Sequence, residues 1–377
     1  MVRLKIAIAG TRGIPARYGG FETFAEELSK RLVERGHEVA VYCRPGSADI
    51  LSAVPGRAGR PRSQDVHRIV LPALRHKYFE TVSHTFLSAI DALRRDFDVI
   101  LLCNAANAFV LPLLRAARIP VAINVDGIER HRRKWNVLGK AVYAIGESFS
   151  ALFANRVVAD ADVIADYYRG RYGIEPVTIP YGAEFPPEED SDVLERLGVE
   201  AGKYILYVSR FEPENNPLEV VEAYEKLSNA PTLVMLGAAA YARDLESRLR
   251  SHASDRILFP GALYGSDYRT LQRNALIYIQ ATEVGGTHPA MIEAMASGGC
   301  VLANDTPENR EVGADAAGYF RLRPVQTLSG ILSEYLESPA LRERMRIAAR
   351  ARAGEKYGWT AVTEAYERLL GEISGRR

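Results

Sequence analysis

The chain has 377 residues, of which 47% are apolar and 25% are charged. These values are typical of a globular protein of two ordinary domains and exclude a disordered or fibrous chain. Its three cysteines are widely spaced, which predicts a reducing compartment and argues against a zinc site. No apolar run approaches the roughly 20 residues of a membrane span, so we expect a cytoplasmic protein.

The formal net charge of +1 is divided unequally along the chain. Residues 1–182 contain 26 Lys+Arg and 18 Asp+Glu, whereas residues 183–377 contain 22 and 29. We expect the basic N-terminal half to meet an anionic surface, such as the inner face of a membrane, where the protein would be peripheral. Ordinary variation of surface charge is the alternative interpretation.

Alternating strands and helices fill the N-terminal half. A strand over Arg3–Ala9 is followed by a loop with four glycines and by an amphipathic helix over Phe21–Arg35 that stops at Gly36. Further strands are predicted at Glu38–Tyr42, Val99–Cys103, Val121–Val125, Val157–Ala159 and Val177–Ile179. This alternation is typical of a parallel sheet with helices on both faces.

A proline- and acid-rich segment, residues 180–190, is interpreted as an interdomain linker. A second α/β series follows it and ends in a helical tail from Leu341. Its strands are predicted at Tyr204–Ser209, Thr232–Leu236, Ile257–Phe259, Ile277–Gln280 and Val301–Ala303. The fold class is therefore α/β, with two doubly wound Rossmann-like domains.

The most informative segment is a glycine loop that runs into a proline-started helix. The loop holds Gly285, Gly286, Thr287 and His288, and the helix carries one acid, Glu293, which we place in its first turn. Such a helix end offers free N–H groups and a positive dipole to a phosphate. An adjacent carboxylate accepts hydrogen bonds from sugar hydroxyls, which predicts a nucleotide-sugar site.

This segment resembles the signature of the retaining glycosyltransferases of family 4. In that family a Glu, seven residues and a second Glu precede a tail that Ala294–Val301 matches. Glu293 fits the second Glu, whereas the first is absent because position 285 is glycine. The strings "IPYGAE", "YVSRFEPENNP" and "YGWTAVTEAYERLL" are similar to the family's hinge, phosphate loop and terminal helix. The strings "GTRGIPARYGGFETFAEEL" and "VDGIERHRRKW" resemble a bacterial rhamnosyltransferase subgroup.

The resemblance implies the GT-B architecture, in which two Rossmann-like domains face a central cleft. Residues 1–182 would form the acceptor-binding domain and residues 183–356 the nucleotide-sugar-binding domain. The terminal helix, residues 357–377, would pack back on the first domain.

The donor site implied by the family begins with Arg210, which follows a strand end where a guanidinium clamps phosphate oxygens. An ion pair with Glu212 or Glu214 is the alternative. A family Lys is replaced by Asn215, so we expect Arg12 or Arg17 to supply the missing cation.

Glu293 would bind the ribose, or else complement the helix dipole. The N–H groups of Gly286, Thr287 and His288 would replace the lost Glu, with Glu283 folding back as a further option. His288 would contact the sugar or cap the helix.

Candidate residues of the first domain also follow strand ends or open a helix. Gly19 and Gly20 would let the backbone approach the donor pyrophosphate or the acceptor, and a plain tight turn is the alternative. Asp126 would orient the sugar or accept the acceptor's proton, unless it is a turn residue. The acceptor pocket would be lined by Arg17, Tyr18, Asn104 and Asn107, where loop capping is the alternative for the two asparagines.

No metal or other cofactor is predicted. The sequences Asp96-Phe97-Asp98 and Asp160-Ala161-Asp162 match a DxD pattern, but each adjoins a strand of the predicted sheet. Helix ends and arginine would then neutralise the leaving diphosphate.

Two basic runs that include aromatic residues suit an anionic membrane interface, namely Arg75–Phe79 and Arg130–Trp135. A solvated face is the alternative. No nucleic-acid-binding motif accompanies these runs, so no nucleic-acid partner is expected.

These features predict a metal-independent retaining transferase with Asp126, Arg210 and Glu293 as catalytic residues. It would move a sugar, preferably rhamnose, from a dTDP- or UDP-linked donor to a glycan or lipid-linked acceptor in surface polysaccharide synthesis. A UDP-hexose donor, a binding protein with little transfer activity and a GT-B epimerase are the alternatives. An NADP dehydrogenase using Arg44 is the most remote, since Gly10-x-x-Gly13 is an incomplete phosphate-binding motif.

Overall fold

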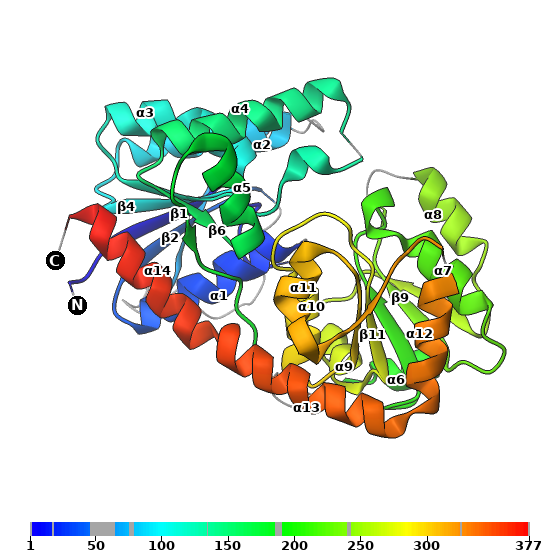
Figure 1. The fold of residues 1–377 in the computed structure, drawn as a ribbon. Coiled ribbons are helices and arrows are strands. Elements are labelled where there is room, and N and C mark those ends of the chain that lie inside the picture. Colours follow the sequence, from blue (N-terminus) through cyan, green and yellow to red (C-terminus); the bar gives the residue numbers. More distant parts are fainter. Residues whose placement is uncertain are drawn as a thin grey trace. The chain divides into compact units, whose positions relative to one another are not determined.

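The computed structural model describes residues 2–16, 19–45, 65–74, 79–133, 135–184, 191–239, 243–324 and 326–375. The chain forms two compact units. Unit 1 contains Met1–Arg130, Trp135–Tyr181 and Trp359–Arg377, and unit 2 contains His131–Lys134 and Gly182–Gly358. Each unit has one parallel sheet between layers of helices (Figure 1). This confirms the prediction of two doubly wound α/β domains.

The sheet of unit 1 has the strand order β3-β2-β1-β4-β5-β6-β7, and every neighbouring pair is parallel. Its central strands are buried along their whole length, as expected of a sheet covered on both faces. The strand β3 was not predicted, because four mostly exposed residues give no apolar pattern. The strands are β1 (Lys5–Ala9), β2 (Glu38–Cys43), β3 (His67–Val70), β4 (Val99–Cys103), β5 (Val121–Asn124), β6 (Arg156–Ala159) and β7 (Val177–Thr178).

Helices α2, α3 and α4 cover one face of this sheet, and α1 and α14 cover the other (Figure 1). The α-helices are α1 (Gly20–Glu34), α2 (Phe79–Ala92), α3 (Leu111–Ala116), α4 (Val137–Phe153), α5 (Asp162–Tyr172) and α14 (Trp359–Ser374). The short 3₁₀ turns are η1 (Ala105–Val110) and η2 (Glu129–His131).

The terminal helix α14 is anchored to unit 1 by a buried polar network. The hydroxyl of Tyr366 accepts a 2.9 Å hydrogen bond from Asn124. The carboxylate of Glu367 accepts a 2.6 Å hydrogen bond from Arg35 and lies 2.8 Å from Nε2 of His37. Burial alone would raise the pKa of Glu367, but these partners outweigh it and hold the pKa below its usual value.

We predict that Glu367→Gln lowers the free energy of unfolding by about 2 kcal/mol at pH 7, because charge-assisted hydrogen bonds are lost. A depressed carboxylate pKa stabilises the fold above the unfolded pKa of about 4.3 and loses that effect as the pH falls through the folded pKa. Urea titrations at pH 7 and below pH 4 should therefore show a difference that shrinks in acid. Glu364→Gln is the control, since Glu364 lies 3.5 Å from Arg35 and is half exposed. Equal losses in the two variants would contradict the prediction.

The sheet of unit 2 has the strand order β10-β9-β8-β11-β12-β13 and is also parallel throughout. The strand β13 was not predicted, because a segment of only three residues gives no clear apolar pattern. The strands are β8 (Tyr204–Val208), β9 (Thr232–Leu236), β10 (Ile257–Gly261), β11 (Ile277–Gln280), β12 (Val301–Asn304) and β13 (Gly318–Phe320).

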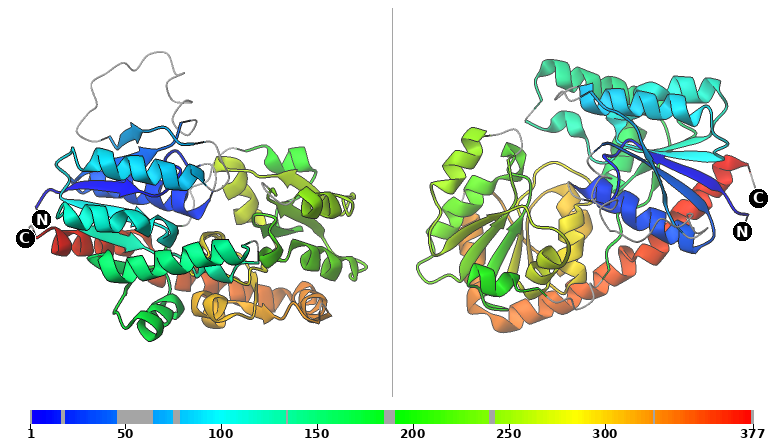
Figure 2. Two further views of the ribbon diagram at one scale, coloured as in Figure 1. Left: turned by 90° about the horizontal axis from the view of Figure 1, so that it is seen from above. Right: turned by 180° about the vertical axis from the view of Figure 1, so that it is seen from behind.

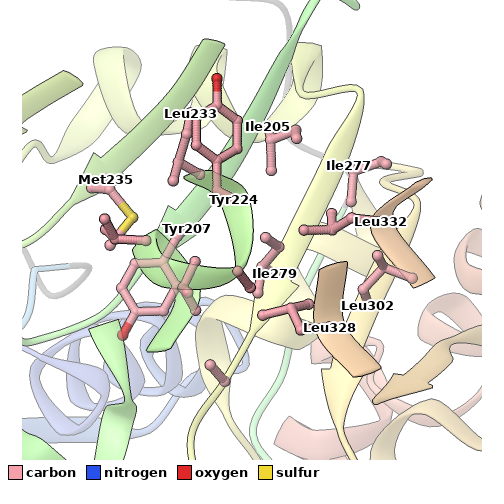
Figure 3. Close-up of a cluster of buried hydrophobic side chains, with 14 of the residues drawn as sticks. Ile205, Tyr207, Tyr224, Leu233, Met235, Ile277, Ile279, Leu302, Leu328 and Leu332 are labelled. Atoms are coloured by element: carbon pink, nitrogen blue, oxygen red, sulfur yellow. The ribbon is translucent and has the colours of Figure 1, made fainter. Parts of the chain in front are cut away.

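One buried core lies between this sheet and the helices on one of its faces (Figure 3). Alternate residues of the strands, such as Ile277 and Ile279, point toward Leu328 and Leu332 of α12. The α-helices are α6 (Val193–Leu197), α7 (Pro217–Glu225), α8 (Arg243–Arg250), α9 (Gly265–Asn274), α10 (Pro289–Ala296), α11 (Pro307–Gly313), α12 (Gln326–Glu337) and α13 (Pro339–Lys356). The 3₁₀ turns are η3 (Pro213–Asn215) and η4 (Ala314–Ala316).

The described part of the expected linker is tied to the end of α13. The N–H of Ala183 donates a 2.6 Å hydrogen bond to the carbonyl of Tyr357, in an isolated parallel bridge. Residues 185–190 of that linker lie outside the described residues.

Candidate functional site

The candidate donor site of unit 2 lies at the carboxyl ends of β8 and β11. These neighbouring strands flank the point at which the strand order reverses, where ligands bind in open α/β sheets. The loops that follow the two strands are joined by hydrogen bonds. The N–H of Glu283 donates to the carbonyl of Glu214 (2.9 Å), and the amide of Asn216 donates to the carbonyl of Ala281 (2.9 Å). The predicted residues Arg210 and Gly285–His288 therefore belong to one pair of adjoining loops.

Two guanidinium groups lie beside one carboxylate at this edge. Arg210 is exposed, with Nη1 3.7 Å from Oε1 of Glu212. The buried Arg132 lies 3.6 Å from the other oxygen of Glu212 and 3.5 Å from Glu214, whose side chain is fully buried. The ion pair of Arg210 with Glu212, which was the alternative interpretation, therefore exists. Because Glu212 also contacts Arg132, two guanidinium groups lie close to one carboxylate.

Arg132 was not predicted at this position, although the sequence showed it within a basic run. The sequence suggested Arg12 or Arg17 as substitutes for the missing Lys. Arg12 belongs to unit 1, 4.0 Å from Glu80, and Arg17 lies outside the described residues. Asn215 itself is buried, and its amide donates a 2.7 Å hydrogen bond to the carbonyl of Arg210. Asn215 therefore shapes the loop that carries Arg210.

Gly285 and His288 are sterically coupled. A Cβ atom on Gly285 would lie 2.2 Å from Cε1 of His288, so the imidazole occupies the space of a side chain at position 285. His288 is the N-cap residue of α10, but its side chain makes no capping hydrogen bond. Burial, with the positive charge of Arg132 as a second cause, lowers the pKa of His288 to about 3. The ring is therefore neutral at pH 7.

We predict that Gly285→Ala destabilises the protein by about 1–2 kcal/mol, because the new methyl group must displace the imidazole ring. The double variant Gly285→Ala/His288→Ala should recover most of this loss, which urea unfolding midpoints would show. Gly330→Ala is the control, since Gly330 lies in α12 with open space around it. Additive effects of the two substitutions would contradict this coupling.

Glu293 lies in the second turn of α10, five residues into the helix, which corrects its expected place in the first turn. It therefore does not serve mainly as a partner of the helix dipole. Its Oε2 accepts a 2.5 Å hydrogen bond from the hydroxyl of Tyr268 on α9. Gln272 in turn donates to that hydroxyl (2.6 Å) and to the carbonyl of Ala290 (3.1 Å). The carboxylate is thus oriented by a neighbour that the sequence did not reveal. Gly286 and Thr287 are buried in the adjoining loop.

In unit 1, Gly19 is the N-cap of α1 and Gly20 is its first residue. The backbone of Gly19 is extended, so its conformation does not itself require glycine. The buried carboxylate of Glu22, which sequence analysis overlooked, accepts a 2.9 Å hydrogen bond from the N–H of Arg12. Burial raises the pKa of Glu22. The hydrogen bond between Arg12 and Glu22 connects the first glycine loop to the first turn of α1.

The two asparagines near β4 have structural partners. Asn104 has a positive φ of 73°, and its side chain accepts a hydrogen bond from the N–H of Ala106 at 2.9 Å. Asn107 is fully buried, and its amide donates to the carbonyls of Gly10 (3.1 Å) and Cys103 (2.7 Å). The structure therefore favours the loop-capping alternative for both. Arg17 and Tyr18, the other expected acceptor ligands, lie outside the described residues.

Asp126 follows β5 in a left-handed conformation, with φ of 56°. Its Oδ1 accepts a 3.1 Å hydrogen bond from the hydroxyl of the buried Tyr181. The negative charge of Asp126 adds to burial in raising the pKa of Tyr181 well above its usual value. Asp126 is thus a turn residue, as the alternative interpretation held, and it also positions a carboxylate at the carboxyl edge of the unit 1 sheet.

The remaining motifs have local partners. In the first DxD sequence, Asp98 accepts a 2.8 Å hydrogen bond from the N–H of Lys5; in the second, Asp160 is fully buried and Asp162 begins α5. Arg44, the suggested NADP ligand, is buried with Thr81 (3.0 Å) and Glu80 (3.4 Å). That arrangement removes the support for a dehydrogenase.

Three arginines of the basic run that ends at Trp135 lie beside carboxylates. Arg130 lies 3.4 Å from the buried Glu147, Arg132 lies beside Glu212, and Arg133 pairs with Glu283 at 2.5 Å. Arg130 and Arg132 thus have acidic partners, whereas the side chain of Arg133 is 46% exposed. The other basic run, residues 75–78, lies outside the described residues.

Two family models match the chain. The model described as Glycosyltransferase Family 4 matches residues 18–184, and the model described as Glycosyl transferases group 1 matches residues 194–352. The protein is a glycosyltransferase with the GT-B fold, and it is similar to family 4. Both matched segments contain candidate residues. Gly19 and Asp126 lie in the first, and Arg210 and Glu293 lie in the second.

This glycosyltransferase is similar to characterised proteins over its whole length. It is 27% identical to a phosphatidyl-myo-inositol mannosyltransferase of Mycolicibacterium smegmatis, over 95% of this chain and 91% of the relative. Sucrose-phosphate synthase of Thermosynechococcus elongatus shares its fold with a TM-score of 0.82 and 19% identity, covering all of both chains. Anabaena HepE in complex with UDP-glucose has a TM-score of 0.79 and 15% identity, covering 98% of this chain and all of HepE.

Proposed function

We propose that the protein is a retaining transferase that uses a nucleotide-diphosphate sugar, and that unit 2 binds the donor. The observation that carries this proposal is the pair of guanidinium groups, Arg210 and Arg132, held beside Glu212 next to the start of α10. A diphosphate carries the charge that two such groups and a helix N-terminus bind. Solved neighbours of the same fold hold UDP and UDP-glucose, which supports a ligand of this class.

In the proposed reaction the acceptor oxygen bonds to the anomeric carbon while the bond from that carbon to the phosphate oxygen breaks. The acceptor proton passes to the departing phosphate oxygen on the same face of the sugar. Arg210 and Arg132 stabilise the negative charge that develops on the diphosphate. Glu293, oriented by Tyr268, holds the ribose hydroxyls, and the neutral imidazole of His288 contacts the donor sugar in place of the lost Glu. No metal or cofactor is proposed.

The finer assignments are a rhamnosyl donor linked to dTDP or UDP and a glycan or lipid-linked acceptor of a surface polysaccharide, at the inner membrane face. The rhamnosyl donor rests on the N-terminal strings and on the altered position 285. The lipid-linked acceptor is supported by the mannosyltransferase relative, whose name gives a phosphatidyl acceptor. In unit 1 we propose Asp126 as the carboxylate that orients the sugar.

The test is transfer of label from dTDP-rhamnose, UDP-glucose and GDP-mannose to a lipid extract of bacterial membranes. We expect label from one donor in the organic phase, with retained anomeric configuration by NMR. Binding without transfer to any acceptor would favour a binding protein, and epimerised donor in the absence of acceptor would favour an epimerase. An inverted product would overturn the retaining mechanism.

A further inference from the structure

We infer that helix α4 docks unit 1 onto an anionic lipid surface. The exposed side of α4 is apolar along its whole length. Leu138, Ile145 and Leu152, spaced seven residues apart, are 73%, 55% and 67% exposed. Val137 and Val142 extend this surface and are 85% and 49% exposed. These five residues are called the α4 stripe below.

The acidic side chain of α4 faces the protein instead. Glu147 is buried and accepts hydrogen bonds from Tyr167 (2.8 Å) and Tyr172 (2.9 Å). At Gly146 the helix packs so closely on η1 that a Cβ atom would lie 2.4 Å from the carbonyl oxygen of Ala105. Lys140 is the exposed charged residue of this helix, and it is a cation. The helix therefore presents to solvent the kind of face that other helices bury.

Neighbouring helices on the same face of the sheet add apolar and cationic groups. Figures 1 and 2 show α2, α3 and α4 together on that face. Val82 and Phe86 of α2 are 39% and 50% exposed. Arg115 of α3 and the adjacent Arg118 are exposed as well. Apolar side chains edged by cations are the combination that inserts into the interface of anionic lipids.

Charge and size favour lipid over a second copy of this chain as the occupant. A helix of 17 residues is about 25 Å long and 10 Å wide, a footprint of roughly 250 Å². Each partner of a stable protein interface buries about 800 Å². Phosphate headgroups also complement Lys140, the exposed charge of this helix. Among the described residues no helix is long and apolar enough to cross a membrane, so α4 would lie in the interface.

This inference gives a physical site to the proposed membrane partner, but its test does not depend on transfer activity. Full-length protein is sedimented with vesicles of phosphatidylglycerol and phosphatidylcholine, or of phosphatidylcholine alone. We expect binding to the anionic vesicles that falls as salt rises, and at least a tenfold loss of binding in the variant Leu138→Ser/Ile145→Ser/Leu152→Ser. Ile347→Ser is the control, because Ile347 is 64% exposed in unit 2.

Unchanged vesicle binding of the triple variant, or no binding by the wild type, would overturn the inference. A wild-type dimer in sedimentation equilibrium that the triple variant loses, without vesicle binding, would assign the stripe to a second copy and also overturn it. The melting temperature of the triple variant should stay close to that of the wild type, since the three replaced side chains are exposed. Transfer to a detergent-dispersed acceptor would be retained if only this inference failed, and absent if the proposed function failed.

Discussion

Replacement of Arg132 by methionine is expected to weaken UDP or dTDP binding about 100-fold. The arginine would donate charge-assisted hydrogen bonds to the diphosphate, each contributing about 1.5–3 kcal/mol, and methionine cannot donate any. Isothermal titration of the nucleoside diphosphate into both proteins measures the change. Arg133→Met is the matched control, because Arg133 is adjacent in sequence, half exposed and paired with Glu283.

The same substitution tests stability separately from binding. Removing Arg132 leaves the carboxylate of Glu214 buried without this cation, at a cost of about 3–5 kcal/mol. The double variant Arg132→Met/Glu214→Gln should regain most of that stability in urea unfolding, yet still bind the diphosphate weakly. If the double variant also regained affinity, Arg132 would be a structural ion-pair partner, and our assignment to the donor would be wrong.

The second large effect is expected for Glu293→Ala, a loss of about 100-fold in affinity for UDP, whose ribose has two free hydroxyls. A carboxylate that accepts two ribose hydroxyl hydrogen bonds contributes about this much. Tyr268→Phe should lose only about fivefold, because it removes the group that orients the carboxylate and not the carboxylate itself. Calorimetric titration with UDP and with its 2′,3′-dideoxy analogue measures both changes.

The dideoxy analogue distinguishes ribose binding from a purely structural role. Wild type should prefer UDP to the analogue, and Glu293→Ala should bind the two equally. A preference for the ribose that survives in Glu293→Ala would show that the hydroxyls are bound elsewhere. Melting temperatures of the two variants show whether folding is intact.

The sequence predicted the architecture well because each buried strand is a short apolar run bounded by glycine, proline or polar residues. The strands β4, β9 and β11 have the expected bounds. The exceptions β3 and β13 are short segments at sheet edges, where pairing with a neighbour and not composition decides the conformation.

The candidate site was less predictable, since its residues meet only through the fold. Arg210 was predicted because it follows a strand, and Glu293 because it lies in a proline-started helix after a glycine loop. Arg132 was not, because its neighbours in the chain suggested a solvated basic run, and only the ion pairs with Glu212 and Glu214 reveal its place. The steric conflict between a side chain at position 285 and His288 was likewise not predictable, because it depends on where the imidazole points.

The central claim, that unit 2 binds the diphosphate of an activated sugar through Arg210 and its neighbours, is tested most directly by comparing diphosphate with monophosphate. UDP, dTDP, UMP and dTMP are titrated into wild type and Arg210→Ala. We predict that wild type binds at least one diphosphate about tenfold or more tightly than the matching monophosphate, and that Arg210→Ala loses this preference. A preference of equal size in both proteins, or no binding of any diphosphate by wild type, would contradict the account.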